Sequence, residues 1–324
     1  MNILVTGGAG YIGSHAVKVL GEKSHSVLTY DNLSKGHQDA VLYGELIAGD
    51  LADAELLERT IRDFRPDAVM HFASFIEVGE SVKEPVKYYQ NNVANTIKLL
   101  QVLIKQGVDK FIFSSSAAVY GSPEKVPITE NECIKPINPY GHSKAIIEQV
   151  LSDLSAASRF RSVSLRYFNA AGADPAGRIG ERHNPESHLI PLILKTAKGE
   201  REQASIYGSD YSTPDGTCVR DYIHVIDLVE AHLLALEYLL DGGMSGVFNC
   251  GYGHGHSVRE VIEVAKEVTK IEFSVQVVGR RAGDPPLLVA DSSRLKQLLN
   301  WHPKHDDLHY IIRTAWNWEK NSTY

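Results

Sequence analysis

Tyr140 and Lys144 are four residues apart, in the pattern YxxxK. On a helix that spacing places both side chains on one face, and Asn138 followed by Pro139 is typical of a helix N-terminus. A phenol has an ordinary pKa near ~10, so it acts as a base at neutral pH only where positive charge lowers that pKa. The Lys144 ammonium and the helix N-terminus would supply such charge. The pair predicts proton transfer by Tyr140, tuned by Lys144.

Three consecutive serines precede this pair in the chain. The stretch from Lys110 to Ser114 predicts a buried strand, and it delivers Ser114, Ser115 and Ser116 to the carboxyl edge of a sheet. Ligands of parallel sheets bind at that edge. A serine hydroxyl there can hydrogen-bond a reacting oxygen and pass its proton to Tyr140.

Three glycines follow the first apolar run in the spacing GxxGxxG, at Gly7, Gly10 and Gly13, and a helical pattern begins at Tyr11. Glycines between a strand and a helix allow a tight turn and let a pyrophosphate approach the backbone N–H groups at the helix N-terminus. Glycines in this spacing also occur in turns that bind nothing. The strand and helix on either side favour a dinucleotide site.

Two acidic residues end the next two predicted strands. Asp31 comes 18 residues after Gly13, where a carboxylate accepts hydrogen bonds from the adenosine ribose and repels a 2′-phosphate. Asp50 could bond the adenine edge, although a carboxylate there is also common in loops. The pattern therefore favours NAD over NADP, and an oxidised nicotinamide ring would add a further positive charge near Tyr140.

The elements that position these residues alternate between short apolar runs and helical periodicity. Strands are expected near 2–6, 25–30, 45–49, 67–72, 110–114 and 161–166. This is the pattern of an α/β fold with a Rossmann-type, doubly wound parallel sheet. A Gly- and Pro-rich segment from 169 to 191 interrupts the pattern, and later helices are expected at 225–240, 257–270 and 308–318. We expect an NAD-binding domain over 1–170, to which 225–250 returns, and a smaller, mixed α/β substrate domain over 171–324.

Composition excludes several classes of function. The 324 residues are 43% hydrophobic and 23% charged, with a net charge of -7 and no long run of like charge. We expect neither nucleic-acid binding nor a membrane span, and no signal segment opens the chain. The three cysteines have no spacing that suggests zinc or a disulfide, so no metal site and a cytoplasmic location are expected.

Five motifs together carry a resemblance to a known family. They are GGAGYIG at 7–13, FSSSAAVYG at 113–121, YGHSK at 140–144, LRYFN at 165–169 and DGTCVRDYIHV at 215–225. Over nearly its whole length the chain resembles the extended short-chain dehydrogenase/reductase superfamily, and within it the UDP-glucose 4-epimerases. The resemblance implies a tightly bound NAD cofactor, with Tyr140 as base, Lys144 as its partner and Ser116 assisting proton transfer.

The resemblance also implies which residues contact NAD. These are Gly7, Gly10, Tyr11, Ile12, Gly13, Asp31, Asn32, Leu33, Ser34, Asp50, Leu51, Phe72, Ala73, Ser74, Asn91, Ser116, Tyr140, Lys144 and Phe168.

The implied reaction interconverts UDP-galactose and UDP-glucose through a 4-keto sugar that turns over inside the site. Such a turn requires tight binding of the UDP and loose binding of the hexose. Arg220 and Arg281 are suited to the diphosphate, and Asp284 to the uridine ribose. The implied substrate contacts are Ser116, Tyr140, Asn169, His188, Leu189, Ser205, Ile206, Tyr207, Arg220, Arg281, Asp284 and Leu288.

Three positions depart from the family pattern. Ile76 stands where some members carry a cofactor-binding lysine, and His188 stands in place of an asparagine. Leu288 replaces a bulky tyrosine beside the hexose, which predicts that N-acetylated UDP-hexosamines are also accepted. UDP-glucuronate stays open as a substrate.

Two other functions could use the same cofactor-binding fold. A nucleotide-sugar 4,6-dehydratase needs an Asp-Glu pair where this chain has Ala117 and Ala118, which argues against that reaction. An NAD-sensing regulator without catalysis would have no use for an intact Ser116, Tyr140 and Lys144.

Two predicted helices, near 86–104 and 140–154, carry more apolar residues than one core face needs. Among these residues are Ile146, Ile147, Val150 and Leu151. The helices could pack within the chain, or against a second copy as a four-helix bundle. With the resemblance, the pattern predicts a homodimer.

Overall fold

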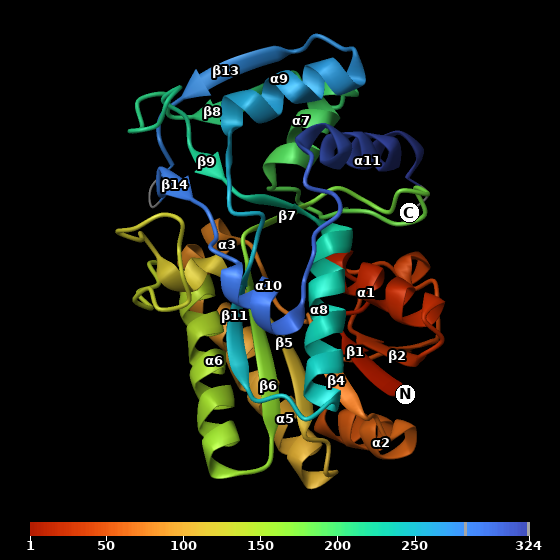
Figure 1. Cartoon of the computed structure of the whole chain (residues 1–324). Helices are drawn as coiled ribbons and strands as arrows, with labels where there is room; N and C mark the ends of the chain where they lie inside the picture. The colour runs from red at the N-terminus through yellow and green to blue at the C-terminus, as the bar shows by residue number, and fades with distance from the viewer. Residues whose placement is uncertain (282–283, 323–324) are drawn as a thin grey trace.

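A seven-stranded parallel sheet forms the base of the molecule in the computed structural model, which describes residues 1–281 and 284–322 (Figure 1). The strand order is β11–β6–β5–β4–β1–β2–β3. The strands are β1 (Asn2–Thr6), β2 (Ser26–Asp31), β3 (Glu45–Ala48), β4 (Ala68–His71), β5 (Lys110–Ser116), β6 (Arg161–Tyr167) and β11 (Gly246–Cys250). The order reverses between β1 and β4, so the expected doubly wound, Rossmann-type sheet is confirmed.

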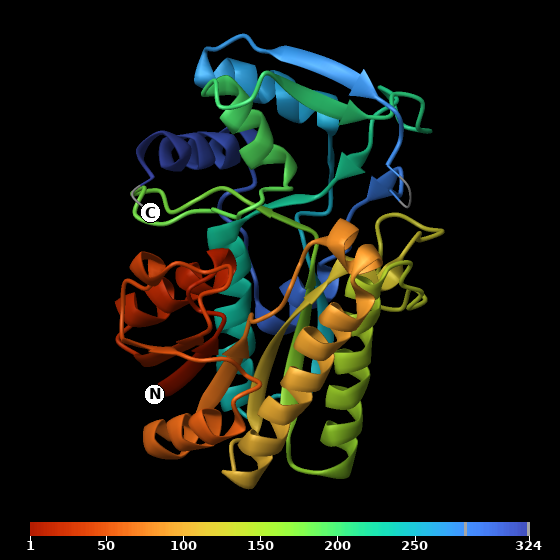
Figure 2. The same cartoon turned by 180° about the vertical axis from the view of Figure 1, so that it is seen from behind.

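Alternate residues of each strand point to opposite faces of this sheet, and helices bury both faces. In β1, Ile3 and Val5 join one core cluster and Leu4 joins the other. The flanking helices are α1 (Tyr11–Glu22) and α8 (Val225–Leu240) on the first face, and α2 (Ala54–Phe64), α5 (Asn95–Lys105) and α6 (Pro139–Ala157) on the second. Figure 2 shows the second face.

A smaller lobe lies above the sheet in Figures 1 and 2. Its strands form three small sheets: β7 (Asn169–Ala171) with β10 (Tyr222–His224), β8 (Gln203–Tyr207) with β13 (Ser274–Val278), and β9 (Val219–Arg220) between β12 (His256–Ser257) and β14 (Leu287–Leu288). Its helices are α7 (Leu189–Ala197), α9 (Val258–Thr269) and α11 (Leu308–Asn321). The three later helices expected from the sequence are confirmed as α8, α9 and α11.

Short helical segments complete the chain. They are η1 (Gln38–Ala40), α3 (Val78–Lys83), α4 (Pro85–Tyr88), η2 (Tyr89–Ala94), η3 (Ala117–Tyr120) and α10 (Ser293–Leu299). Within residues 1–281 and 284–322, no helix has both the length and the apolar character needed to cross a bilayer.

The helix expected near 86–104 differs from the observed structure. It is divided into α4, the π-helical segment η2 and α5. Asn92 in η2 is buried, and its amide both accepts from Phe75 N at 2.9 Å and donates to Phe75 O at 3.0 Å. Asn92 thereby pairs with both backbone hydrogen-bonding groups of Phe75, in the loop after β4. The wider π-helical turn occurs at the same place. Such π segments often occur at functional sites.

Candidate functional site

The glycine turn packs so closely against neighbouring backbone that side chains cannot fit at two of its positions. Gly7 has a φ of +76°, and a Cβ there would lie 2.4 Å from Ala73 N. A Cβ on Gly13 would lie 2.1 Å from Gly7 O. Gly10 caps α1 without a side-chain hydrogen bond, and the first turn of α1 contains no acidic residue. The N-terminal N–H groups of α1 therefore form a cradle suited to a pyrophosphate.

The two acidic strand ends predicted for the adenosine lie together. Asp31 accepts from Ala9 N at 3.0 Å and from Leu33 N at 2.8 Å, which holds its carboxylate beside the glycine turn. Burial raises the pKa of Asp31, in part offset by these backbone hydrogen bonds. Asn32 donates to Asp50 Oδ2 at 2.8 Å. Each carboxylate oxygen can accept a second hydrogen bond, so both residues can still receive ribose or adenine donors.

The loop after β4 lies against the same turn. Phe72 N and Ala73 N both donate to Thr6 O, at 2.8 and 3.1 Å, and Asn91 donates to Asn92 Oδ1 at 2.9 Å. Parallel strands place these loops at one edge. The structure therefore brings the glycine turn, the acidic strand ends and the β4 loop to one end of the sheet. Ile76, where the family pattern places a cofactor contact, lies on the same loop.

The expected start of α6 is confirmed. Asn138 Oδ1 accepts from Gly141 N at 2.8 Å, and Pro139 is the first helical residue. Tyr140 in this first turn is 7% exposed and hydrogen-bonds the Ser116 side chain. One turn later, Lys144 Nζ donates to Ser114 O at 2.9 Å and lies 5.8 Å from the Tyr140 ring centroid. The three residues predicted to act together are therefore in contact.

The proton affinity of Tyr140 differs from the sequence expectation. Burial raises the pKa of Tyr140, and the hydrogen bond to Ser116 lowers it only in part. Burial also lowers the pKa of Lys144 to about 7, although the negative charge of Glu148 acts in the opposite direction and raises it. The expected lowering by Lys144 and the helix N-terminus is thus outweighed by desolvation. A further positive charge is needed to make Tyr140 a base at neutral pH.

A buried ionic network next to Ser116, Tyr140 and Lys144 was not predicted from the sequence. Glu148 pairs with Arg166, with Oε2 and Nη2 2.5 Å apart, and accepts from Ser115 Oγ at 2.5 Å. Arg166 Nη1 also donates to the Tyr120 hydroxyl at 2.8 Å, and that hydroxyl donates to Asn249 at 2.7 Å. The only sequence signal was a glutamate one helical turn after Lys144. Its arginine partner comes from β6.

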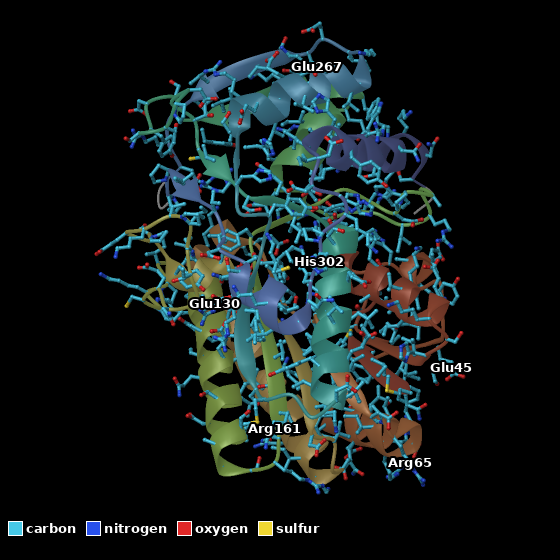
Figure 3. The ribbon with its side chains drawn as sticks, viewed as in Figure 1. Glu45, Arg65, Glu130, Arg161, Glu267 and His302 are labelled. Carbon is cyan, nitrogen blue, oxygen red and sulfur yellow. The ribbon has the colours of Figure 1, made fainter. Side chains whose placement is uncertain are left out.

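The same network reaches β11. Glu130 accepts from the backbone N–H of Asn249 at 2.8 Å, and Figure 3 labels its side chain. Tyr167, at the end of β6, hydrogen-bonds Ser114 Oγ at 2.9 Å. Tyr167 and Glu148 therefore hold two consecutive residues of the serine strand, Ser114 and Ser115.

The small lobe brings three of the predicted substrate residues to the serine edge. Arg220 Nη2 lies 3.6 Å from Asp284 Oδ1, and Arg220 pairs in register with Leu288. Leu288 packs against a cluster that includes Ala117 and Phe168, which come directly after Ser116 and Tyr167. Arg220 and a small apolar surface that includes Leu288 therefore lie on the side of the small lobe that faces Ser116 and Tyr140.

The other predicted substrate residues line the small lobe. Arg281 stacks 4.4 Å from the Tyr207 ring centroid at the end of β8. The Ile206 side chain is 2% exposed, so this residue can offer a ligand only its backbone. Asn169 N donates to Asp221 O at 3.0 Å.

His188 caps α7, directly before Leu189. Its Nδ1 lies 2.6 Å from Glu181 Oε1. Burial would lower the pKa of His188, but the Glu181 and Glu186 carboxylates raise it to about 10.

Comparison with known proteins places this site in a family. Residues 3–251 match the model of the NAD dependent epimerase/dehydratase family. The chain belongs to this family. Its match spans the glycine turn, the serine strand and the Tyr140–Lys144 pair, so the residues in contact here lie on the family's common scaffold.

Three members illustrate the similarity. The UDP-glucose 4-epimerase of Azospirillum brasilense is 52% identical over 320 residues, which are 98% of this chain and 92% of the relative. The structure of UDP-glucose 4-epimerase from Brucella ovis in complex with NAD is 48% identical, covers 97% of both chains and has a TM-score of 0.95. The UDP-Glc/GlcNAc 4-epimerase of Campylobacter jejuni is 45% identical over 98% of this chain and 99% of that chain, with a TM-score of 0.87.

Proposed function

We propose that the protein is an NAD-dependent UDP-glucose 4-epimerase that interconverts UDP-galactose and UDP-glucose. The observation that best supports this function is that Ser116, Tyr140 and Lys144 lie together at the carboxyl edge of the sheet, beside the glycine turn. The name and 52% identity of the Azospirillum relative support the substrate.

The glycine cradle would hold the cofactor pyrophosphate, and Asp31 would accept from the adenosine ribose. The residues fit this group, because glycine at positions 7 and 13 lets the turn close against neighbouring backbone, and α1 begins there without a side-chain cap or an acidic residue. Bound NAD would supply hydride transfer from and to the sugar C4, and its positive ring would add the further charge that Tyr140 needs.

Tyr140 is the acid and base of the reaction. Its phenolate takes the proton of the sugar 4-hydroxyl, and Ser116, which hydrogen-bonds Tyr140, orients that hydroxyl. The result is a 4-keto sugar with a planar C4. After the hexose turns over, Tyr140 returns the proton to the 4-oxygen, which yields the inverted sugar.

The two ends of the substrate are bound differently. Arg220 and Arg281 would grip the diphosphate and Asp284 the uridine ribose, whereas the hexose would face the apolar side chains of Leu288 and Phe168. Apolar walls offer few directional contacts, so the sugar can turn while the nucleotide stays fixed.

The test is a conversion assay without added cofactor. Purified protein is mixed with UDP-galactose, and UDP-glucose is followed. Conversion supports both the reaction and a retained NAD. A folded protein with bound NAD that converts no nucleotide sugar would sink the proposal and revive the NAD-sensing alternative.

We also propose that N-acetylated UDP-hexosamines are substrates. Leu288 leaves more room beside the sugar than a tyrosine would, and the name of the Campylobacter relative includes UDP-GlcNAc.

We propose that the working enzyme is a cytoplasmic homodimer formed through a four-helix bundle. Val86 is 78% exposed and Ile146 40% exposed. Ile147 and Leu151, however, are 0% and 1% exposed in the chain's own core, so for these two residues the packing is within the chain, which was one of the two alternatives left open by the sequence. Free Cys133, Cys218 and Cys250 suit a reducing compartment.

We further propose two domains within this fold. Residues 1–170, with the returning segment 225–250, would bind NAD, and the rest of 171–324 would bind the UDP-sugar. The packing of α8 against the sheet and the pairing of β11 with β6 support this division.

A further inference from the structure

Two histidines and two glutamates gather on the segment before α7. One ligand atom from each of Glu181, His183, Glu186 and His188 lies within 4.8 Å of all the others. The segment packs on the loop after β2, where Lys35 Nζ donates to Asn184 O at 3.2 Å. No metal site was predicted from the sequence, because the pattern ExHxxExH at 181–188 contains none of the cysteine spacings that are typical of zinc.

Glu186 has one oxygen that the protein satisfies and one that it does not. Oε1 accepts from Ser187 N at 2.7 Å and from His188 N at 2.9 Å. Oε2 is buried without a hydrogen-bond partner, on a side chain that is 3% exposed. A buried carboxylate oxygen without a partner is costly, so this atom points to a missing ligand.

The histidine nitrogens show the same arrangement. His183 Nδ1 lies 3.2 Å from Glu181 Oε1 and 3.7 Å from Glu186 Oε2. His188 Nδ1 lies 2.6 Å from Glu181 Oε1 and 3.4 Å from Glu186 Oε1. Neither Nδ1 has a hydrogen bond of acceptable geometry. The histidine nitrogens and carboxylate oxygens are therefore close together, but their directions are not those of hydrogen bonds.

The spacing and charge suit a zinc ion. Bonds of about 2.1 Å in a tetrahedron hold ligand atoms ~3.4 Å apart, and the contacts here range around that value. The two imidazoles, which are protonated beside the carboxylates in the absence of metal, must lose their protons to bind an ion. The two carboxylates then carry a charge of −2, which a divalent ion neutralises in place of those protons. Imidazole nitrogen with carboxylate oxygen favours zinc over magnesium, which prefers oxygen alone.

We propose that Glu181, His183, Glu186 and His188 form a structural zinc site that fastens the segment before α7. With Nδ1 on the metal, Nε2 of His188 stays free for other partners. The proposal does not depend on the catalytic activity.

A second group of histidines provides the control. His254, His256, Asp306 and His309 line an open hollow of about 450 Å³ beside α9. There the His254–Asp306 and His309–Glu267 pairs have satisfied hydrogen bonds at 2.7 and 3.0 Å. Glu267 lies on α9 at the far end of the molecule from the sheet (Figure 3). Zinc on this surface would be adventitious.

The experiment measures metal binding to tag-free protein stripped with a chelator. Zinc and magnesium are titrated by calorimetry into the wild type, Glu186→Gln and Glu267→Gln. We expect one zinc ion per chain in the wild type and in Glu267→Gln, its loss in Glu186→Gln, and no magnesium binding. Absence of stoichiometric zinc in the wild type, or equal binding by Glu186→Gln, would overturn the proposal.

A second measurement covers the case in which Glu186→Gln fails to fold. Cobalt is added to the wild type, and its visible absorption is recorded before and after zinc. Intense bands of a four-coordinate ion that zinc removes support the site, whereas only the weak bands of a six-coordinate ion refute it.

Discussion

Burial governs the chemistry of Tyr140 more than its nearest charges do. Desolvation raises its pKa, and the same desolvation lowers the pKa of Lys144 to about 7. A lysine with that pKa is only partly protonated at neutral pH, so it supplies less positive charge to lower the pKa of Tyr140. The reaction proposed here therefore couples the proton affinity of Tyr140 to the charge of the bound cofactor.

Replacing Tyr140 by phenylalanine tests the role of its hydroxyl. Tyr140→Phe keeps the buried ring, so we expect retained NAD and an unchanged melting temperature, with kcat for UDP-galactose lower by about 10²–10⁴. Tyr238→Phe is the matched control, because that hydroxyl accepts only from Met244 N at 3.1 Å, on the surface. A Tyr140→Phe enzyme with near wild-type kcat would contradict the mechanism.

The size of residue 288 should control substrate range. Leu288 and Phe168 both pack against the apolar cluster that contains Ala117, and we propose that a tyrosine at 288 would fill space beside the sugar. We expect the wild type to convert UDP-GlcNAc, and Leu288→Tyr to lose at least about tenfold more kcat/KM for UDP-GlcNAc than for UDP-galactose. Parallel assays of both sugars decide the point, and equal losses would argue against contact with the hexose.

Helix caps link local sequence to the geometry of the site. The Asn138 cap sets where α6 begins and therefore where Tyr140 meets Ser116. The π-helical turn of η2 acts similarly: Asn92 Nδ2 donates to Ser143 Oγ at 3.2 Å and so ties η2 to α6. At this scale the catalytic group is held by its own helix and by the neighbouring one.

Removing two caps separates stability from positioning. Asn138→Ala and Asp307→Ala each delete a side-chain cap, that of Asp307 accepting from His309 N at 2.9 Å at the start of α11. Each should lower the free energy of unfolding by about 0.5–2 kcal/mol in urea titrations. Only Asn138→Ala should also lower kcat. Equal kcat values in the two variants would show that the cap does not position Tyr140.

For the whole molecule, four buried histidines predict sensitivity to acid. Burial lowers the pKa of His71 and His224 to about 3, and of His15 and His232 to about 4, from 6.5. Between about pH 4 and 6.5 the unfolded chain therefore binds more protons, and the free energy of unfolding falls as pH falls, by up to about 1.4 kcal/mol per pH unit for each histidine. Urea titrations at several pH values measure this slope.

One substitution tests the origin of that slope. His232→Leu should reduce the change in free energy of unfolding per pH unit by about the contribution of one histidine. His302→Leu, at an exposed position labelled in Figure 3, should leave this pH dependence unchanged. The titrations use metal-free protein, in which His183 and His188 have raised pKa values, so these two histidines do not add to the loss of stability as pH falls. An unchanged slope in His232→Leu would refute the assignment.

Assembly can be tested at the same scale. Val86→Glu and Ile146→Glu place charge in the proposed helix bundle, so sedimentation should show monomers. Leu298→Glu, at a 55% exposed position on α10, should leave the dimer intact. A monomeric wild type would rule out the dimer.

The sequence by itself determined the features that depend on local spacing. Gly7, Gly10 and Gly13 mark a strand-to-helix turn, Asn138 and Pro139 mark the start of α6, and apolar runs mark the six strands from β1 to β6. These features are readable because backbone conformation and helical or strand periodicity act over a few residues.

Only the tertiary structure decided which distant residues meet. Glu148 finds Arg166 on β6, and Leu288 finds Ala117, through strand order and register that no local pattern encodes. The gathering of Glu181 and His188 likewise depends on how one segment folds back on itself. The proton affinity of Tyr140 also depended on the tertiary structure, because burial, and not the spacing to Lys144, sets the cost of its charge.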